Sequence, residues 1–306
     1  MKCRLFASLT LVVLSMLFVG CTSDNAMQEA SQVSNLQEVD FSVFEKTQED
    51  LPTRADDASS VPLSETNLFT ELEVALIPVD QPNTVKDSVR QLSTDEKFGE
   101  AKMYVPKGEY YLVAVAAKTK KPGNGHQITI KSNTEIDFPD NIVTDMAYYY
   151  EKVTIGDQKK SLSVPLKRAV SAFYVISADQ CVANAKSFEV SITKGVGSVF
   201  NPFTGFCTKE ETYTRQFDIS DKKGKILAFT IYVLLPEKER KDVSITLKSI
   251  DTNGNLLKTT TFNDVHLVYG KRTNYKGPLF NNTVSTSFTF SEGEIDNAED
   301  VTHEFD

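Results

Sequence analysis

Histidines, the side chains most often used for acid–base chemistry near neutral pH, are scarce in this sequence. Among its 306 residues there are three: His126, His266 and His303. The first lies beside a Gly-Asn-Gly loop, the second inside a strand-like run, and the third in an acidic tail. No two of them have metal-ligand spacing, and the sequence contains no Gly-x-Ser-x-Gly nucleophile motif. The sequence therefore predicts a protein that is not an enzyme and that holds no metal and no cofactor.

The N-terminal segment has the features of a signal peptide. Lys2 and Arg4 precede an uncharged apolar run from Leu5 to Val19, which has the length of a signal-peptide core and is short for a membrane span. The stretch LFVGC, which ends at Cys21, resembles a bacterial lipobox, where the cysteine is lipidated and becomes the first residue of the mature chain. Because more than one acyl chain anchors a protein stably, we expect attachment to outer-membrane lipid through acylated Cys21.

Two cysteines remain after Cys3 leaves with the leader and Cys21 takes lipid: Cys181 and Cys207. In an exported protein they either form a disulfide or stay as free thiols. The sequence leaves both alternatives open, because it does not give the distance between their Cα atoms. A nucleophilic pair of either thiol with His266 is conceivable, but structural roles are favoured.

The net charge and the composition indicate which classes of partner the protein can bind. The net charge is −9 and no run of Lys and Arg stands out, which argues against a nucleic-acid partner, since phosphate binding needs clustered basic residues. Three consecutive tyrosines suggest a sugar platform as an alternative function. In a strand, Tyr148 and Tyr150 would face one way and Tyr149 the other, so at least one of them is expected in the core.

The central part of the chain alternates apolar and polar residues, which is typical of β-strands. Leu72, Val74 and Leu76, for example, alternate with Glu71 and Glu73. No helical stretch is long enough to cross between parallel strands, so we predict an all-β protein with two tandem antiparallel β-sandwich domains. The expected divisions are a signal peptide (1–20), a lipidated tether with one strand (21–61), a first sandwich (62–156), a second sandwich (157–290) and an acidic tail (291–306).

A tight hairpin is predicted over residues 243–262. Two alternating runs flank Asn253-Gly254, a pair that tolerates the positive φ angles of a two-residue turn.

A single strand-like stretch stands apart in the tether. Val39, Phe41 and Val43 alternate with Asp40 and Ser42, as a strand with one buried face requires. We therefore interpret this stretch as a candidate complementing strand. The alternative is a tether segment that packs permanently against its own domain.

Beyond this stretch, Arg54 is the one basic residue between Lys46 and Lys86, and it precedes Ala55 in a polar run. Polar, accessible segments of this kind are where proteases cut. Arg54 and Ala55 therefore form a candidate cleavage site. The alternative is an uncut linker arginine.

Several of these stretches, in their order and spacing, resemble the fimbrillin superfamily of anaerobic Gram-negative bacteria, and most closely its FimB-type anchor and minor subunits. The resemblance covers most of residues 17–290. The matching stretches are LFVGC, VDFSVF followed by TRA, GEYYL from Gly108, VPLKRAVSAFYV (164–175), YVLLP (232–236) and GKRTNYKGPLF (270–280).

The resemblance implies two transthyretin-like β-sandwiches, location in a surface-exposed fimbria anchored to the outer membrane, and other fimbrial subunits as partners. It also implies that an N-terminal strand fills a groove until a protease cuts after an arginine, here Arg54, and that a neighbouring subunit's strand then occupies the groove. A cut there would separate the chain from its lipid, so an anchor must avoid it. An anchor, a terminal subunit, and a surface lipoprotein that binds a glycan or a host protein all stay open.

Overall fold

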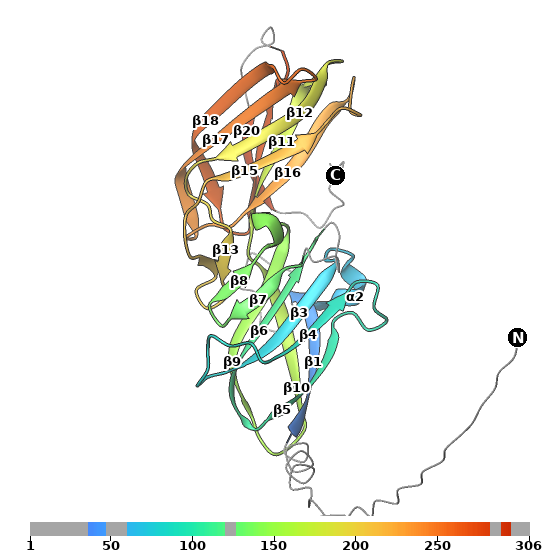
Figure 1. Cartoon of the computed structure of the whole chain (residues 1–306), viewed down its shortest axis with the longest axis vertical. Helices are drawn as coiled ribbons and strands as arrows, with labels where there is room; N and C mark the ends of the chain where they lie inside the picture. The colour runs from blue at the N-terminus through green and yellow to red at the C-terminus, as the bar shows by residue number, and fades with distance from the viewer. Residues whose placement is uncertain (1–35, 47–59, 120–126, 282–288, 295–306) are drawn as a thin grey trace, which may run out of the picture. The chain divides into compact units, whose positions relative to one another are not determined.

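The computed structural model describes residues 36–46, 60–119, 127–281 and 289–294, the last segment by its backbone (Figure 1). Nearly all regular structure in these ranges is β-strand. The helical pieces are one turn each, α2 (Leu63–Thr66) and the 3-10 turn η1 (Pro139–Asn141). Among the described residues, neither piece approaches the length and apolar character that crossing a membrane requires.

The first sandwich is built from eight strands. They are β1 (Leu36–Lys46), β2 (Ser60–Pro62), β3 (Glu71–Pro78), β4 (Asp87–Leu92), β5 (Glu100–Pro106), β6 (Gly108–Ala117), β9 (Met146–Ile155) and β10 (Lys160–Arg168). Their order is β2-β1-β10-β9-β6-β3-β4, and β5 also pairs with β1. Strand β10 pairs with β9 only at its end, through Lys167↔Tyr148 and Arg168↔Ala147. The sheet therefore divides there into two layers, with β1 in one and β3 in the other.

Strand β3 is buried on both faces, because apolar residues occupy both. Leu72 and Leu76 point into the core of the first sandwich, whereas Ala75 and Ile77 belong to a second cluster on the opposite face of the strand. This strand is therefore an inner layer with packing on each side.

A small third sheet covers that opposite face. Its strands are β7 (Thr129–Ser132), β8 (Glu135–Asp137), β13 (Val199–Asn201) and β14 (Phe206–Cys207), in the order β14-β13-β8-β7. Strand β13 pairs with β8 through Phe200↔Ile136, and the Phe200 ring meets Tyr148 edge-on with centroids 4.7 Å apart. Residues from the second half of the chain thus complete the packing of the first half.

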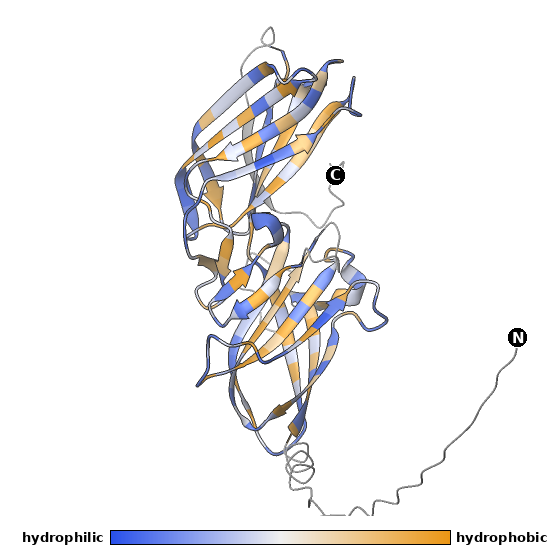
Figure 2. Cartoon of the chain, in the orientation of Figure 1, coloured by the Kyte–Doolittle hydropathy of each residue, from blue (hydrophilic) through white to orange (hydrophobic). Residues whose placement is uncertain are grey.

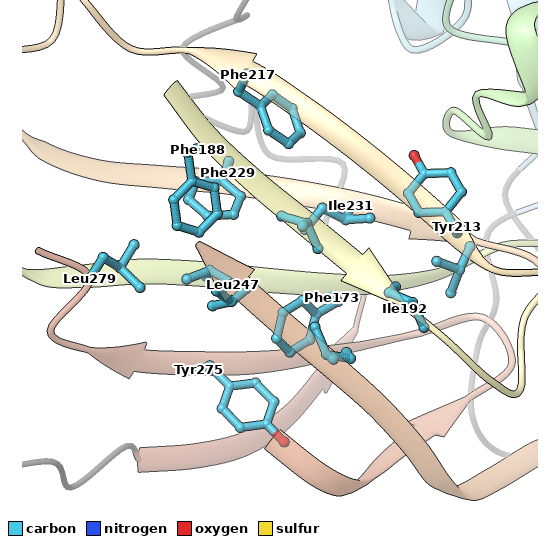
Figure 3. Packing of buried hydrophobic residues seen from close by; sticks show 14 of the residues in the cluster. Phe173, Phe188, Ile192, Tyr213, Phe217, Phe229, Ile231, Leu247, Tyr275 and Leu279 are labelled. Carbon is cyan, nitrogen blue, oxygen red and sulfur yellow. The ribbon is translucent and has the colours of Figure 1, made fainter. Parts of the chain in front are cut away.

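The second sandwich consists of two four-stranded sheets around an aromatic core. Its strands are β11 (Ser171–Gln180), β12 (Ala185–Ile192), β15 (Tyr213–Asp218), β16 (Ile226–Val233), β17 (Glu239–Asp251), β18 (Leu256–Val268), β19 (Lys271–Gly277) and β20 (Thr289–Glu294). The sheets have the orders β16-β11-β19-β20 and β15-β12-β17-β18. Apolar and polar residues alternate along these strands (Figure 2), and the rings of Phe173, Phe188, Phe229 and Tyr275 fill the space between the sheets (Figure 3).

The all-β class and the two sandwich cores are confirmed. The predicted hairpin of β17 and β18 is also confirmed. Its turn is longer than the predicted two-residue turn, because β17 ends at Asp251 and β18 begins at Leu256, and between them Gly254 has a positive φ (+83°) whereas Asn253 does not. Two pairs, β1 with β10 and β11 with β19, are parallel, unlike the antiparallel pairing that we predicted. No helix is needed for them, because each pair is separated by a long stretch of other strands.

The expected domain limits stay a prediction, but strand pairing bears on them at two places. Residue 157 falls before β10, whose partners β1 and β9 belong to the first sheet. The expected acidic tail starts at residue 291, whereas β20 pairs with β19 as far as Glu294. Backbone pairing can continue into polar sequence, because it uses N–H and C=O groups alone.

Candidate functional site

Strand β1 has pairing partners along both of its edges. On one edge it runs parallel to β10, from Val39↔Lys160 to Glu45↔Leu166. On the other edge it pairs with β5 and, at its end, antiparallel with β2 (Phe44↔Pro62). An N-terminal strand therefore occupies an interior place in its layer.

The inward side chains of β1 form part of the first core. Val39, Phe41 and Val43 are 0%, 1% and 4% exposed. Burial of three such side chains contributes on the order of 5–8 kcal/mol before the entropy of ordering the strand is subtracted. We call the strands β5 and β10, together with the core residues that face β1, the β1 seat; its core residues include Met103, Val105, Val164, Leu166, Leu72 and Leu112.

The outward side chains at the start of β1 form an ion-pair cluster with its neighbours. The Lys102 and Lys159 ammonium groups each lie 2.7 Å from Oε1 of Glu38. Lys159 also lies 2.5 Å from Oδ2 of Asp40. Hydrogen bonds from Lys102 and Lys159 lower the pKa of Glu38 to about 2, while the carboxylates raise the pKa of both lysines. We call these four residues the β1 charge cluster.

A carboxyl group is buried at the other end of β1. Glu45 is 6% exposed, and burial raises its pKa, although the positive charge of Arg168 acts in the opposite direction. Arg168 is already engaged with Asp145, with Nε 2.9 Å from Oδ1 and Nη2 2.9 Å from Oδ2. The end of β1 thus carries an acid whose ionised form is disfavoured by its surroundings.

Gly99 closes the seat where β5 begins. The N–H of Val43 donates to its carbonyl oxygen, and its φ is +96°. A Cβ placed there would approach Cβ of Leu63 to 3.0 Å. Next to this contact lies an open cavity of about 250 Å³ lined by residues of β1, α2 and the turn before β5.

The structure places the remaining predicted residues as follows. Cys21, Arg54 and Ala55 lie outside the described residues. The flanks of the Arg54 segment are described, and they are adjacent: Lys46, the last residue of β1, lies opposite Ser60 of β2.

Cys181 and Cys207 are both buried and both free. Cys181 belongs to the second core and Cys207 to the cluster under the third sheet, so the disulfide alternative is not the arrangement found. Burial raises the pKa of each thiol, to about 11 for Cys207, which keeps both in the unreactive protonated form.

The three consecutive tyrosines, residues 148–150, do not present one exposed aromatic surface. Tyr148 is buried, as expected for at least one of the three. Tyr150 is half-buried between two rings, Tyr111 stacked at 5.7 Å and Phe203 edge-on at 5.6 Å. The exposed aromatic residue of this group is Phe203, at 66%.

Sequence reasoning missed Lys102, Lys159 and Gly99. Nothing local marks them, since they meet β1 only through pairing with β5 and through the start of β10. Among the described residues, no group of three or more His, Cys, Asp or Glu is placed to hold a metal ion. His266 lies 2.7 Å from Oε1 of Glu239 on the surface of β18.

Comparison with known proteins adds a family match. The family model DUF6562, described as a family of unknown function, matches residues 126–304. No curated protein matches the sequence significantly.

Several solved structures align with most of this chain at low sequence identity. A proposed polysaccharide-binding protein (DUF1812) from Bacteroides thetaiotaomicron is 10% identical, with a TM-score of 0.48 over 85% of this chain and 98% of that one. A proposed adhesin from Bacteroides ovatus is 14% identical, with a TM-score of 0.47 over 81% and 88%. The fimbrial anchor protein Mfa2 from Porphyromonas gingivalis is 12% identical, with a TM-score of 0.41 over 84% and 97%. All three TM-scores are below one half.

Proposed function

We propose that this chain, which belongs to the DUF6562 family, is a non-catalytic structural subunit of a cell-surface fimbria. It is either an anchor tethered to the outer membrane by lipid on Cys21 or a terminal subunit, and it assembles by β-strand complementation. The observation that carries this proposal is the burial of Val39, Phe41 and Val43 in the β1 seat. The resemblance of the sequence to fimbrillins agrees with it.

The way in which β1 is joined to the chain supports exchange. Lys46 and Ser60 lie opposite each other at the two flanks of the Arg54 segment. A cut after Arg54 would therefore leave β1 held by non-covalent contacts alone: strand pairing, apolar contacts and the β1 charge cluster. Loss of β1 would expose an apolar floor and the edges of β5 and β10, which is the kind of surface that accepts an added strand.

The same cut separates two versions of the function. An anchor keeps its lipid and therefore keeps the Arg54 segment intact, whereas a terminal or stalk subunit begins at Ala55 and has lost β1. Mass spectrometry of the mature N-terminus in assembled fimbriae distinguishes them: a lipidated Cys21 supports the anchor and a free Ala55 supports a processed subunit.

A second candidate function is the binding of a glycan or a host protein by a surface lipoprotein. The observation in its favour is Phe203, exposed on a turn that is fixed by hydrogen bonds from the N–H groups of Phe203 and Thr204 to Oδ1 of Asn201. Aromatic residues, Phe among them, are enriched at protein interfaces. Loss of binding to a glycan array or to host matrix proteins in Phe203→Ala would support this function.

The experiment that tests the main proposal removes residues 38–44 from the full chain. We expect lower thermal stability and self-association in size-exclusion chromatography, because the seat is left open. Addition of a synthetic peptide of residues 36–46 should restore a stable monomer. Unchanged stability after the deletion, or no effect of the peptide on a destabilised variant, would contradict strand complementation.

A further inference from the structure

Two strands, β5 and β2, pair with the edge of β1 that lies opposite β10. We call the place where β5 ends its pairing and β2 begins, at Val43 and Phe44, the fork. The N–H of Val43 donates to the carbonyl oxygen of Gly99, just before β5, across 2.8 Å. The next residue, Phe44, is the first that pairs with β2. The cavity of about 250 Å³ lies at this fork. It is larger than the cavities of roughly 150 Å³ that take up benzene in other proteins, so one large apolar side chain fits.

The end of β1 at the fork includes an unfavourable burial. Phe44 lies opposite Pro62 of β2 on one side and opposite Pro165 of β10 on the other. The next residue, Glu45, is a buried carboxyl group, and burial of such a group opposes folding.

The other end of β1 has favourable ion pairs and, among the described residues, no buried carboxyl group. There the β1 charge cluster joins Glu38 and Asp40 to Lys102 of β5 and to Lys159. The chain end that a cut after Arg54 creates belongs to the fork side, because Lys46 is the last residue of β1 before that segment. Strand β1 is therefore expected to open from the fork toward the charge cluster.

We infer that the fork cavity is the entry site at which an incoming β-strand of a partner subunit first binds, before it displaces β1 from the fork end. This inference rests on the proposed function and adds to it the place and the order of the exchange.

The lining of the cavity specifies the chemistry of the incoming strand. Its apolar lining includes Leu63 and Phe98, which are themselves almost fully buried. Its rim is polar and includes Ser42, Ser64 and Glu100. The site therefore fits an extended segment that places a Leu, Ile or Phe side chain in the cavity and keeps acidic residues away from Glu100. Continuity with the β1 seat favours a strand over any other occupant.

The test uses the full chain with a site-specific protease sequence in place of residues 50–55, cut after folding. A fluorescent peptide of residues 36–46 serves as the incoming strand, and its uptake is followed by anisotropy at several peptide concentrations. Ser64→Trp fills the rim of the cavity, with Ser64→Leu as a smaller substitution. Ser88→Trp is the matched control, because Ser88 is exposed on β4 and does not line the cavity.

We expect the rate of uptake to rise with peptide concentration. It should fall about tenfold in Ser64→Trp, equivalent to losing roughly 1.4 kcal/mol of entry contacts, and by less in Ser64→Leu, while Ser88→Trp behaves as the unsubstituted protein.

A rate that does not depend on peptide concentration would mean that β1 leaves first. That result, or equal rates in all variants, would overturn the entry site and leave the proposed function standing. No uptake at all would overturn both.

Discussion

The backbone N–H of Val43 donates to the carbonyl oxygen of Gly99 across 2.8 Å, and this contact joins β1 to the start of β5. Gly99 has φ +96°, and a Cβ there would meet Val43 O at 3.1 Å. We expect Gly99→Ala to lower the free energy of unfolding by about 1–3 kcal/mol, because it adds backbone strain and pushes β1 outward. Urea denaturation measures this change.

Gly156→Ala is the matched control. A Cβ at Gly156 would meet nothing within 4 Å, so its stability should stay close to that of the unsubstituted protein. Equal effects at both glycines would contradict a tight fit of β1 against Gly99.

Phe41 should be the most sensitive single position of β1. It is 1% exposed within the first core, so Phe41→Ala should cost about 3–5 kcal/mol of unfolding free energy through lost burial and the cavity left behind. Phe203→Ala, at a ring that is 66% exposed, should cost less than about 1 kcal/mol. If chemical denaturation gave the same small change for both, β1 would not be part of the core in solution.

The β1 charge cluster predicts a stability loss in acid. The folded-state pKa of Glu38 is about 2, below its ordinary value of 4.5. The ionised form of Glu38 is favoured by folding, so its stabilising effect is fully present above about pH 4.5 and is lost as the pH falls through about 2. In Glu38→Gln the fall in thermal midpoint between pH 5 and pH 2 should be smaller than in the unsubstituted protein.

Glu65→Gln on α2 provides the comparison for this acid effect. Glu65 is exposed, and the described part of the chain shows no ion pair for it. It should keep the full acid dependence. An acid dependence that is identical in Glu38→Gln and Glu65→Gln would show that the cluster does not stabilise β1.

Glu73 should anchor the third sheet to β3. It lies 2.8 Å from Nη2 of Arg90 and accepts the N–H of Ile130 at 3.0 Å. Glu73→Ala leaves both donors without this acceptor, so we expect a loss of about 1–3 kcal/mol. Hydrogen exchange of the Ile130 amide should become faster. Exposed Glu135 on β8 offers a control, since Glu135→Ala should leave that amide protected; equal exchange in both variants would refute the anchoring role.

The sequence predicted β1 because its pattern is local: Val39, Phe41 and Val43 alternate within a few residues. It did not predict β10 as the partner, since the register Val39↔Lys160 is set by the path of the whole chain. Nor did alternation predict the burial of Glu71, which is 0% exposed. Glu71 is buried because the third sheet covers its face of β3, and one strand of that sheet, β13, comes from far along the chain.

The parallel pairing of β1 with β10 also constrains the order of folding. Strand β1, the first of the described strands to be synthesised, meets its neighbour β10 only after more than a hundred further residues have followed. Until then the Val-Phe-Val face of β1 has no complete site to enter. A chaperone that binds short extended apolar peptides could therefore bind β1 during this interval, and slow completion of the first sandwich would lengthen it.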